Sequence, residues 1–376
     1  MKKIIPFLII IATLCIQVSS GINYIIFPLT IQVQGYSKTL IGLAMSCEIL
    51  ATIILFKHIS VVVKRLGVVQ TVIGASIIRG VVIYILGFNE YLAFWFMGIF
   101  TYGLSTSMVL VVVQTWLNLA ETGKLKGLFI GLYSSSLSLG IALGPILLQF
   151  IPSRTSQFVI NAMITLFPCA ILATVFKYRP TLTSNKTVRI GFIFKHAKII
   201  MLSALVGGVC FFGLPSFLTL YGIANDLSPN EAALLLTMFM IGSVSIGAFI
   251  SSLSAFIDRI LIIYICVCFS VVCAVFLSLA VYAHLGVALT LLVIWGGSMG
   301  GIYATGLAYI GQVFRKEDQI SANTSFVLMD ALGGFLGLFV IGTSMDFIGD
   351  EGLTYTIVIA STCYLIFITK RLTAKL

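Results

Sequence analysis

Charged residues are scarce in this 376-residue chain, where Asp, Glu, Lys and Arg together make up 9% of the sequence. A typical soluble domain carries about 25%. Hydrophobic residues make up 60%, and the mean hydropathy is +1.14. This composition excludes an ordinary soluble domain and indicates an integral membrane protein within a lipid bilayer.

The motifs of common catalytic and metal sites are also missing. The three histidines are scattered at His58, His196 and His284, and the sequence contains no H-E-x-x-H, G-x-S-x-G or Walker lysine loop. The eight cysteines include no C-x-x-C pair, so they are interpreted as small residues of apolar segments. The loops are too short to hold a nucleotide-binding domain. We therefore expect neither an enzyme nor a primary pump, and no metal or cofactor.

What the sequence does contain is a series of about twelve apolar runs of about 20 residues, each long enough to cross a hydrocarbon core of about 30 Å. The first run continues past Ser19 and Ser20 to about Leu29, so we expect a membrane span there and not a cleaved signal peptide. The predicted spans are 5–30, 39–57, 67–87, 91–116, 127–150, 157–176, 199–222, 231–256, 260–282, 285–311, 321–345 and 353–370.

The basic residues predict the orientation of these spans. Of the 22 Lys and Arg residues, all except Lys38, Arg79 and Arg154 fall in alternate loops or at the two ends of the chain. The positive-inside rule then places both termini in the cytoplasm, as in a bacterial inner-membrane protein. The net charge of +10 reflects this topology and does not indicate a nucleic-acid partner.

A long polar segment at 177–198 divides the chain into two halves, 1–176 and 199–376. Shifting the sequence by about 190 residues aligns Pro28 with Pro215 and Ser37 with Ser228. Two halves of six spans that both start inside form a parallel repeat about an axis along the membrane normal. The predicted fold is therefore all-α, with 12 transmembrane helices in two six-helix repeats.

These features resemble the major facilitator superfamily of secondary transporters. Lys64-Arg65-Leu66-Gly67, between the second and third spans, is similar to the D-R-x-G segment of that superfamily, with Lys64 where Asp is usual. Gly131, Gly140, Gly144 and Pro145 match the G-x8-G-x3-G-P pattern of its antiporters. The resemblance implies a monomeric transporter that moves a small-molecule substrate across the membrane by alternating access. It also implies that a proton gradient drives this transport.

A finer resemblance is to the bacterial YcaD-like branch. It rests on residues 111–118, which read Val-Val-Val-Gln-Thr-Trp-Leu-Asn, together with Asn23, Pro28 and Asn323. Gln114 stands where that branch commonly has an acidic residue.

The fifth predicted span holds the glycines of the antiporter pattern. We expect Gly131, Gly140 and Gly144 to lie on one stripe where a second helix approaches closely, as in small-xxx-small contacts. Pro145 removes one hydrogen bond and weakens the helix beside this seam. The pattern predicts a tight joint that serves movement between helices, with close packing alone as the alternative.

Glu48, Arg79 and Asp330 are the charged residues well inside predicted spans. Counted at about 1.5 Å per residue, Arg79 and Asp330 lie ~18 Å and ~14 Å from the inner ends of their spans. Burial favours a neutral carboxyl group, whereas a nearby guanidinium favours a carboxylate, so a changing network can load and release a proton. We expect Asp330 to couple transport to protons, while Glu48 and Arg79 either share that role or form a permanent structural pair.

The resemblance implies a cavity lined by the first, fourth, seventh and tenth spans, with the eleventh beside it. These segments hold few polar or aromatic side chains that could contact a substrate. The candidates are Gln17, Asn23, Tyr102, Gln114, Trp295, Tyr303 and Asn323. A nearly uncharged lining suits a neutral or amphipathic compound better than a phosphate or dicarboxylate.

Charges at the predicted cytoplasmic helix ends suggest a gate that pairs in one state and separates in another. The candidate gate residues are Lys64, Arg65, Gly67, Asp258 and Arg259. The alternative is that these charges only set the topology and are solvated.

The sequence favours proton-coupled efflux by antiport. Uptake of a neutral metabolite such as a sugar, by symport or facilitated diffusion, stays open because Leu148 and Gln149 replace the trailing glycines of the antiporter pattern. A membrane receptor or scaffold without transport is a more distant alternative.

Overall fold

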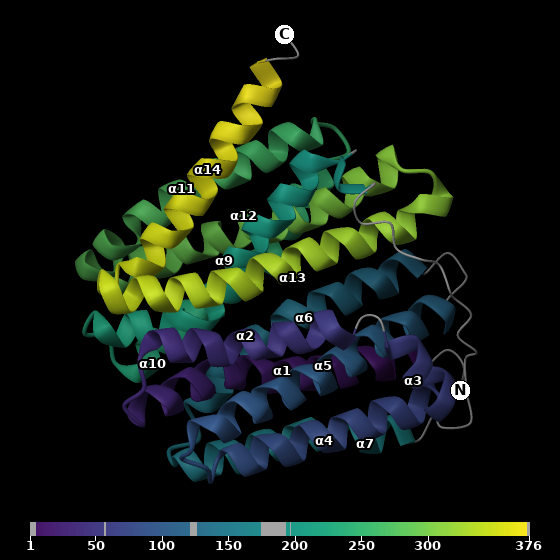
Figure 1. Ribbon diagram of the computed structural model, residues 1–376, viewed down its shortest axis with the longest axis vertical. Helices are drawn as coiled ribbons and strands as arrows, with labels where there is room; N and C mark the ends of the chain where they lie inside the picture. Colours follow the sequence, from purple (N-terminus) through teal and green to yellow (C-terminus); the bar gives the residue numbers. More distant parts are fainter. Residues whose placement is uncertain (1–4, 56–57, 121–125, 174–192, 196, 374–376) are drawn as a thin grey trace. The chain divides into compact units, whose positions relative to one another are not determined.

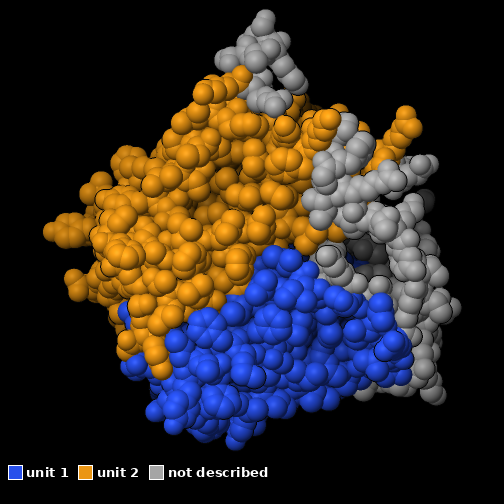
Figure 2. Space-filling model, viewed as in Figure 1, with its two compact units in different colours: residues 1–34, 47–185 blue, residues 35–46, 186–376 orange. Residues whose placement is uncertain are grey.

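The computed structural model describes residues 5–55, 58–120, 126–173, 193–195 and 197–373. Throughout these ranges the regular elements are helices (Figure 1). They divide into two compact units (Figure 2). Unit 1 is residues 1–34 and 47–185, and unit 2 is residues 35–46 and 186–376. The helix α2 (Lys38–Leu55) is therefore divided, because its first half belongs to unit 2 and its second half to unit 1.

Unit 1 is built on α1, which packs against α6 and α7, while α4 packs against α5 and α7. Its helices besides the second half of α2 are α1 (Ile5–Val33), α3 (Ile59–Leu66), α4 (Val68–Leu86), α5 (Leu92–Ala120), α6 (Lys126–Leu148) and α7 (Arg154–Ala173).

Aromatic rings fill part of the core of unit 1. The ring of Phe27 on α1 lies 5.6 Å from that of Trp95 and 5.5 Å from that of Tyr102, measured between centroids, both edge-on. Phe158 on α7 stacks on Phe27 at 6.3 Å. All four side chains are buried, so α1, α5 and α7 share one apolar centre.

In unit 2, α12 packs against α10 and α11, and α13 packs against α9. Its helices besides the first half of α2 are α9 (Lys198–Ala224), α10 (Pro229–Leu253), α11 (Arg259–Ala283), α12 (Leu285–Val313), α13 (Lys316–Phe347) and α14 (Gly352–Thr373). Glycines permit these close approaches. A Cβ atom at Gly242 would collide with the carbonyl of Val293, and one at Gly296 with the carbonyl of Phe239.

Eleven helices in the described part of the chain are long and apolar enough to cross a membrane. The predicted span 157–176 overlaps α7, a 20-residue helix that is not among the eleven. The end of that predicted span, residues 174–176, lies outside the described residues. The helical, multi-pass membrane fold is thus confirmed, while the count of twelve spans in two repeats stays a prediction.

Candidate functional site

Arg79, on α4, is a fully buried charged residue of unit 1, with an exposed fraction of 0%. Its Nη2 atom donates to the carbonyl of Ile16 at 3.0 Å, to the Ser20 hydroxyl at 2.9 Å and to the Tyr102 hydroxyl at 2.9 Å. The guanidinium carbon also lies 4.8 Å from the centroid of the Tyr102 ring, in cation–π geometry. One side of the guanidinium is thus firmly held by α1 and α5.

The other side of this guanidinium has no such partners. Among the described residues, Arg79 Nε and Nη1 are buried and make no hydrogen bond. Glu48, on α2, lies within electrostatic range of Arg79 and Tyr24, but no Arg79 nitrogen is within 4.0 Å of its carboxylate in the described structure. The permanent Glu48–Arg79 pair is therefore not formed here, because a backbone carbonyl and two hydroxyls hold the guanidinium instead. Buried N–H groups without acceptors are costly, so this site favours the approach of an anionic group.

Three predicted cavity residues belong to the polar network around Arg79 or lie beside it. Gln17, Asn23 and Tyr102 are each at most 7% exposed. Ser20 donates to Gln17 Oε1 at 3.2 Å, and Asn161 Nδ2 on α7 donates to Asn23 Oδ1 at 2.6 Å. These side chains therefore link helices within unit 1.

Asp330, on α13, is half-buried and faces α9. Its Oδ1 atom lies 3.9 Å from the position that a Cβ atom at Gly207 would occupy, and a Cβ atom at Gly208 would collide with the Asp330 carbonyl. Within the described residues its carboxylate has neither a hydrogen bond nor an ion pair. The Gly207-Gly208 pair thus brings α9 against α13 beside a carboxyl group without a counter-charge.

The remaining predicted cavity residues lie in different environments. Trp295 is fully buried, and its Nε1 donates to the Ser270 hydroxyl on α11 at 2.9 Å. Tyr303 is 38% exposed and contacts the ring of Phe326 edge-on at 5.4 Å. Gln114 and Asn323 are exposed. Trp295 is therefore placed as a packing residue of α11 and α12, whereas the other three are accessible.

The predicted gate residues of unit 2 make local contacts. Asp258 caps α11 by accepting from the N–H groups of Ile260 and Leu261 at 2.9 Å and 3.0 Å. Arg259 Nη1 donates to the Ala308 carbonyl and to Gln312, both at 2.7 Å on α12. Arg259 thus joins the start of α11 to the end of α12, whereas Asp258 caps α11 alone.

The predicted gate residues of unit 1 lie at the end of α3 and at its junction with α4. Gly67 takes a φ of +89° between the two helices, a conformation that favours glycine. Arg65 is exposed, and the side chain of Lys64 lies outside the described residues.

The predicted glycine stripe of α6 is correct at two of its three positions. A Cβ atom at Gly140 would lie 2.8 Å from the Leu14 carbonyl, and one at Gly144 would lie 2.7 Å from the Val18 carbonyl, so both glycines lie against α1. Gly131 is exposed, and, its own stretch of helix aside, no atom of the described residues lies within 4 Å of its Cβ position. Its placement on the stripe was wrong, because nine residues at about 100° each turn the helix by about 180°. Pro145 lies within α6, which continues to Leu148.

Sequence reasoning missed Ser20 and Asn161, which bond to Arg79 and Asn23. A signal was present, because both are polar residues inside apolar runs, where unsatisfied groups are expensive. Their spacing from the intramembrane charges did not indicate which side chains they would meet.

The helices and the buried charged groups together define a multi-pass helical membrane protein. The charged side chains inside its two units lack some of their hydrogen-bond partners. Residues 9–367 match the Major Facilitator Superfamily. The chain belongs to this superfamily, and it is a transport protein and not an enzyme. None of the curated protein sequences compared with it matches.

Solved structures of transporters share the fold. A bacterial homologue of the human lysosomal transporter Spinster, inward-facing and unoccupied, matches with a TM-score of 0.77 and 13% identity over 97% of this chain and 95% of that one. The nucleoside transporter NupG matches with a TM-score of 0.79 and 13% identity over 96% of each chain. A mutant form of NupG matches with a TM-score of 0.81 and 13% identity over 97% of this chain and 99% of that one. At this identity the likeness extends to the fold alone.

Proposed function

We propose that the chain is a proton-coupled secondary transporter that exports a small neutral or amphipathic compound by alternating access. The observation that carries this proposal is the half-buried Asp330 carboxyl group on α13, which has no hydrogen bond or ion pair within the described residues. An ionised carboxylate inside a membrane is expensive unless it is paired. Asp330 therefore binds a proton where the site is dry and releases it where water enters.

The environment of Arg79 supports a second, linked switch in unit 1. Its Nε and Nη1 atoms are buried without hydrogen-bond partners among the described residues, while Glu48 lies within electrostatic range. A small movement that brings Glu48 to these atoms would stabilise its ionised form, and withdrawal would favour the protonated form. Glu48 and Arg79 thus form a pair that makes and breaks in the proposed cycle.

The scarcity of charge supports a substrate without strong charge. Glu48, Arg79 and Asp330 are the charges well inside the predicted spans, and recognition of a phosphate or dicarboxylate calls for several Arg or Lys side chains. The accessible candidates Gln114, Tyr303 and Asn323 offer amide and hydroxyl groups and one aromatic ring. These groups fit a compound with a few polar atoms on an apolar body.

Uptake of a neutral metabolite by proton symport is the second candidate. The trailing glycines of the antiporter pattern are replaced by Leu148 and Gln149, and the fold is similar to that of a nucleoside transporter. Both candidates share the proposed topology, with twelve spans in two repeats, both termini in the cytoplasm of a bacterial cell, and a monomeric transport unit.

Proton flux in proteoliposomes tests the proposal. The purified protein is reconstituted with an internal pH dye and exposed to a panel of neutral amphiphiles, cationic amphiphiles, sugars and nucleosides, with protein-free liposomes as the control. We expect one class to cause a pH change that depends on the protein. Its sign separates antiport from symport.

The opposite result would be binding or passage of a compound with no movement of protons. Binding without transport would indicate a receptor, and transport without proton movement would indicate a facilitator. Either outcome contradicts proton coupling.

A further inference from the structure

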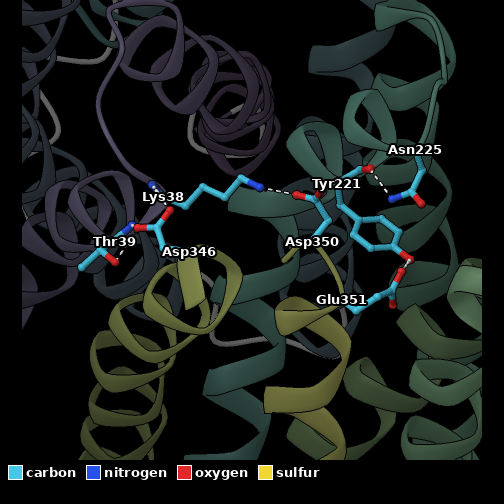
Figure 3. A network of polar contacts seen from close by, with 7 residues as sticks. All are labelled: Lys38, Thr39, Tyr221, Asn225, Asp346, Asp350 and Glu351. Atoms are coloured by element: carbon cyan, nitrogen blue, oxygen red, sulfur yellow. Dashed lines mark hydrogen bonds and ion pairs between the residues drawn. The ribbon is translucent and has the colours of Figure 1, made fainter. Parts of the chain in front are cut away.

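The N-terminus of α2 is capped by a residue far away in the sequence. The backbone N–H of Lys38 donates to Asp346 Oδ1 at 2.9 Å, and that of Thr39 donates to Asp346 Oδ2 at 2.7 Å (Figure 3). The Thr39 hydroxyl donates to the same Oδ2 at 2.6 Å. The first N–H groups of a helix lack intrahelical acceptors, and the helix dipole favours an anion there. Asp346, at the end of α13, thus supplies the cap of a helix that begins 308 residues earlier.

The corresponding helix in the predicted repeat caps itself. Ser228 precedes α10 and forms a capping box with Glu231, whose Oε2 accepts from the Ser228 backbone at 2.9 Å. Ser37 occupies the matching position before α2, but the residue three places on is Leu40, which has no carboxylate. The Leu40 N–H donates to the Ser37 hydroxyl, at 3.3 Å. α2 therefore depends on α13 for contacts that α10 makes locally.

Small residues hold the first half of α2 close to α13. A Cβ atom at Gly42 would collide with the Leu338 carbonyl, and one at Gly342 with the Lys38 carbonyl. One turn beyond Gly42, the buried Ser46 hydroxyl donates to the Phe335 carbonyl at 3.1 Å. The cap thus lies at the end of a close helix–helix seam within unit 2.

An ion pair extends this cluster beyond α13. Lys38 Nζ contacts Asp350, in the turn after α13, with side chains 18% and 33% exposed. The next residue, Glu351, accepts from the Tyr221 hydroxyl near the end of α9 at 3.0 Å. An exposed ion pair contributes little by itself. The charge-assisted bonds from Asp346 to the two backbone N–H groups are therefore the stronger element.

We propose that Asp346, supported by Asp350, is a latch that holds the first half of α2 on α13 in one state of the protein and releases it in another. α2 is one continuous helix, yet Lys38 to Ser46 belong to unit 2 and Cys47 onward to unit 1. Any change in the arrangement of the units must bend α2 or free its first half. Release is the easier route, because Asp346 is exposed and water can replace its bonds. Proton coupling is not required for this latch.

Thiol accessibility at position 46 tests the latch without a known substrate. Ser46 is 1% exposed in the seam, so the Ser46→Cys variant carries a thiol that is covered while α2 lies on α13. This variant is built in a background whose eight native cysteines are replaced by alanine, and is reacted in proteoliposomes with a membrane-impermeant maleimide. We expect Asp346→Ala to raise the labelling rate about tenfold, equivalent to about 1.4 kcal/mol.

Glu231→Ala is the matched control, because it removes the self-made cap of α10 and leaves the seam unchanged. The latch is contradicted by an unchanged rate in Asp346→Ala, or by an equal increase in Glu231→Ala, which would reflect general loosening. If Asp346→Ala does not fold, the pair Lys38–Asp350 decides. Lys38→Asp and Asp350→Lys should each raise the labelling rate, and the double variant should restore the rate of the parent. Single variants that do not raise the labelling rate would overturn the proposal.

Discussion

The ring of Tyr102 lies beside the guanidinium of Arg79, and its hydroxyl accepts a hydrogen bond from Arg79 Nη2 at 2.9 Å. Both side chains are buried, with exposed fractions of 1% and 0%. Tyr102 thus fixes the half of the guanidinium that faces α1 and α5, and leaves Nε and Nη1 on the other side. The contact between Tyr102 and Arg79 therefore sets the orientation of the guanidinium group.

Tyr102→Phe should therefore destabilise the protein. The change keeps the ring but removes one acceptor from a buried cation, which costs about 1.5–3 kcal/mol. A lower apparent melting temperature in detergent would show this. Tyr282→Phe is the control, because Tyr282 is 92% exposed and makes no hydrogen bond to the described residues. Equal melting temperatures for the two variants would show that the bond contributes nothing.

Two glycines of α6 should respond oppositely to the same substitution. A methyl group at Gly144 would lie 2.6 Å from the Ile22 nitrogen and 2.7 Å from the Val18 carbonyl, and this backbone cannot yield without moving α1. Gly131 is exposed, and alanine is the better helix former there by up to about 1 kcal/mol.

We accordingly expect Gly144→Ala to lower the melting temperature and the folded yield, and Gly131→Ala to leave both unchanged or slightly raised. Thermal unfolding and gel filtration of both variants in one detergent would measure this. A Gly144→Ala protein as stable as the parent would disprove close packing of α1 and α6.

The sequence allowed the membrane class and most of the spans to be predicted, because long apolar runs depend on local composition. Pairwise contacts were harder to predict. Gly140 and Gly144 follow from a four-residue spacing on one helix face, whereas Gly131 does not, since its nine-residue spacing turns it to the opposite face. The burial of Arg79 was foreseeable from its place in a span, but its bond to the Ile16 carbonyl was not.

The cap of α2 is another contact that could not be predicted from the sequence. Ser37 and Thr39 signal a helix start, yet nothing near them in sequence indicates that the missing carboxylate comes from Asp346. Contacts between residues so far apart depend on the packing of α2 on α13, which local patterns do not encode.

Trp295 and Ser270 should behave as a structural pair. The indole N–H donates to the buried hydroxyl at 2.9 Å, so Trp295→Phe and Ser270→Ala each remove this buried hydrogen bond, at a cost of about 1–3 kcal/mol. In a double-mutant cycle of thermal stability, the combined loss should be smaller than the sum of the single losses. Strict additivity would show that the two side chains are not coupled. A loss of substrate binding without a loss of stability would instead assign Trp295 to the substrate site.

Asp330→Asn tests whether Asp330 carries the coupled proton, once a transported compound is known. The variant is compared with the parent in two assays, accumulation driven by a proton gradient and exchange of labelled for unlabelled compound without a gradient. Asp226→Asn is the matched control, because Asp226 is an exposed turn residue with a φ of 62°, a conformation that asparagine also tolerates.

We expect Asp330→Asn to abolish accumulation and to retain a substantial part of exchange, because the amide cannot carry the proton but leaves the fold intact. The Asp226→Asn control should match the parent in both assays. Gradient-driven accumulation by Asp330→Asn at the rate of the parent would contradict proton coupling through Asp330, because some other group would then carry the proton.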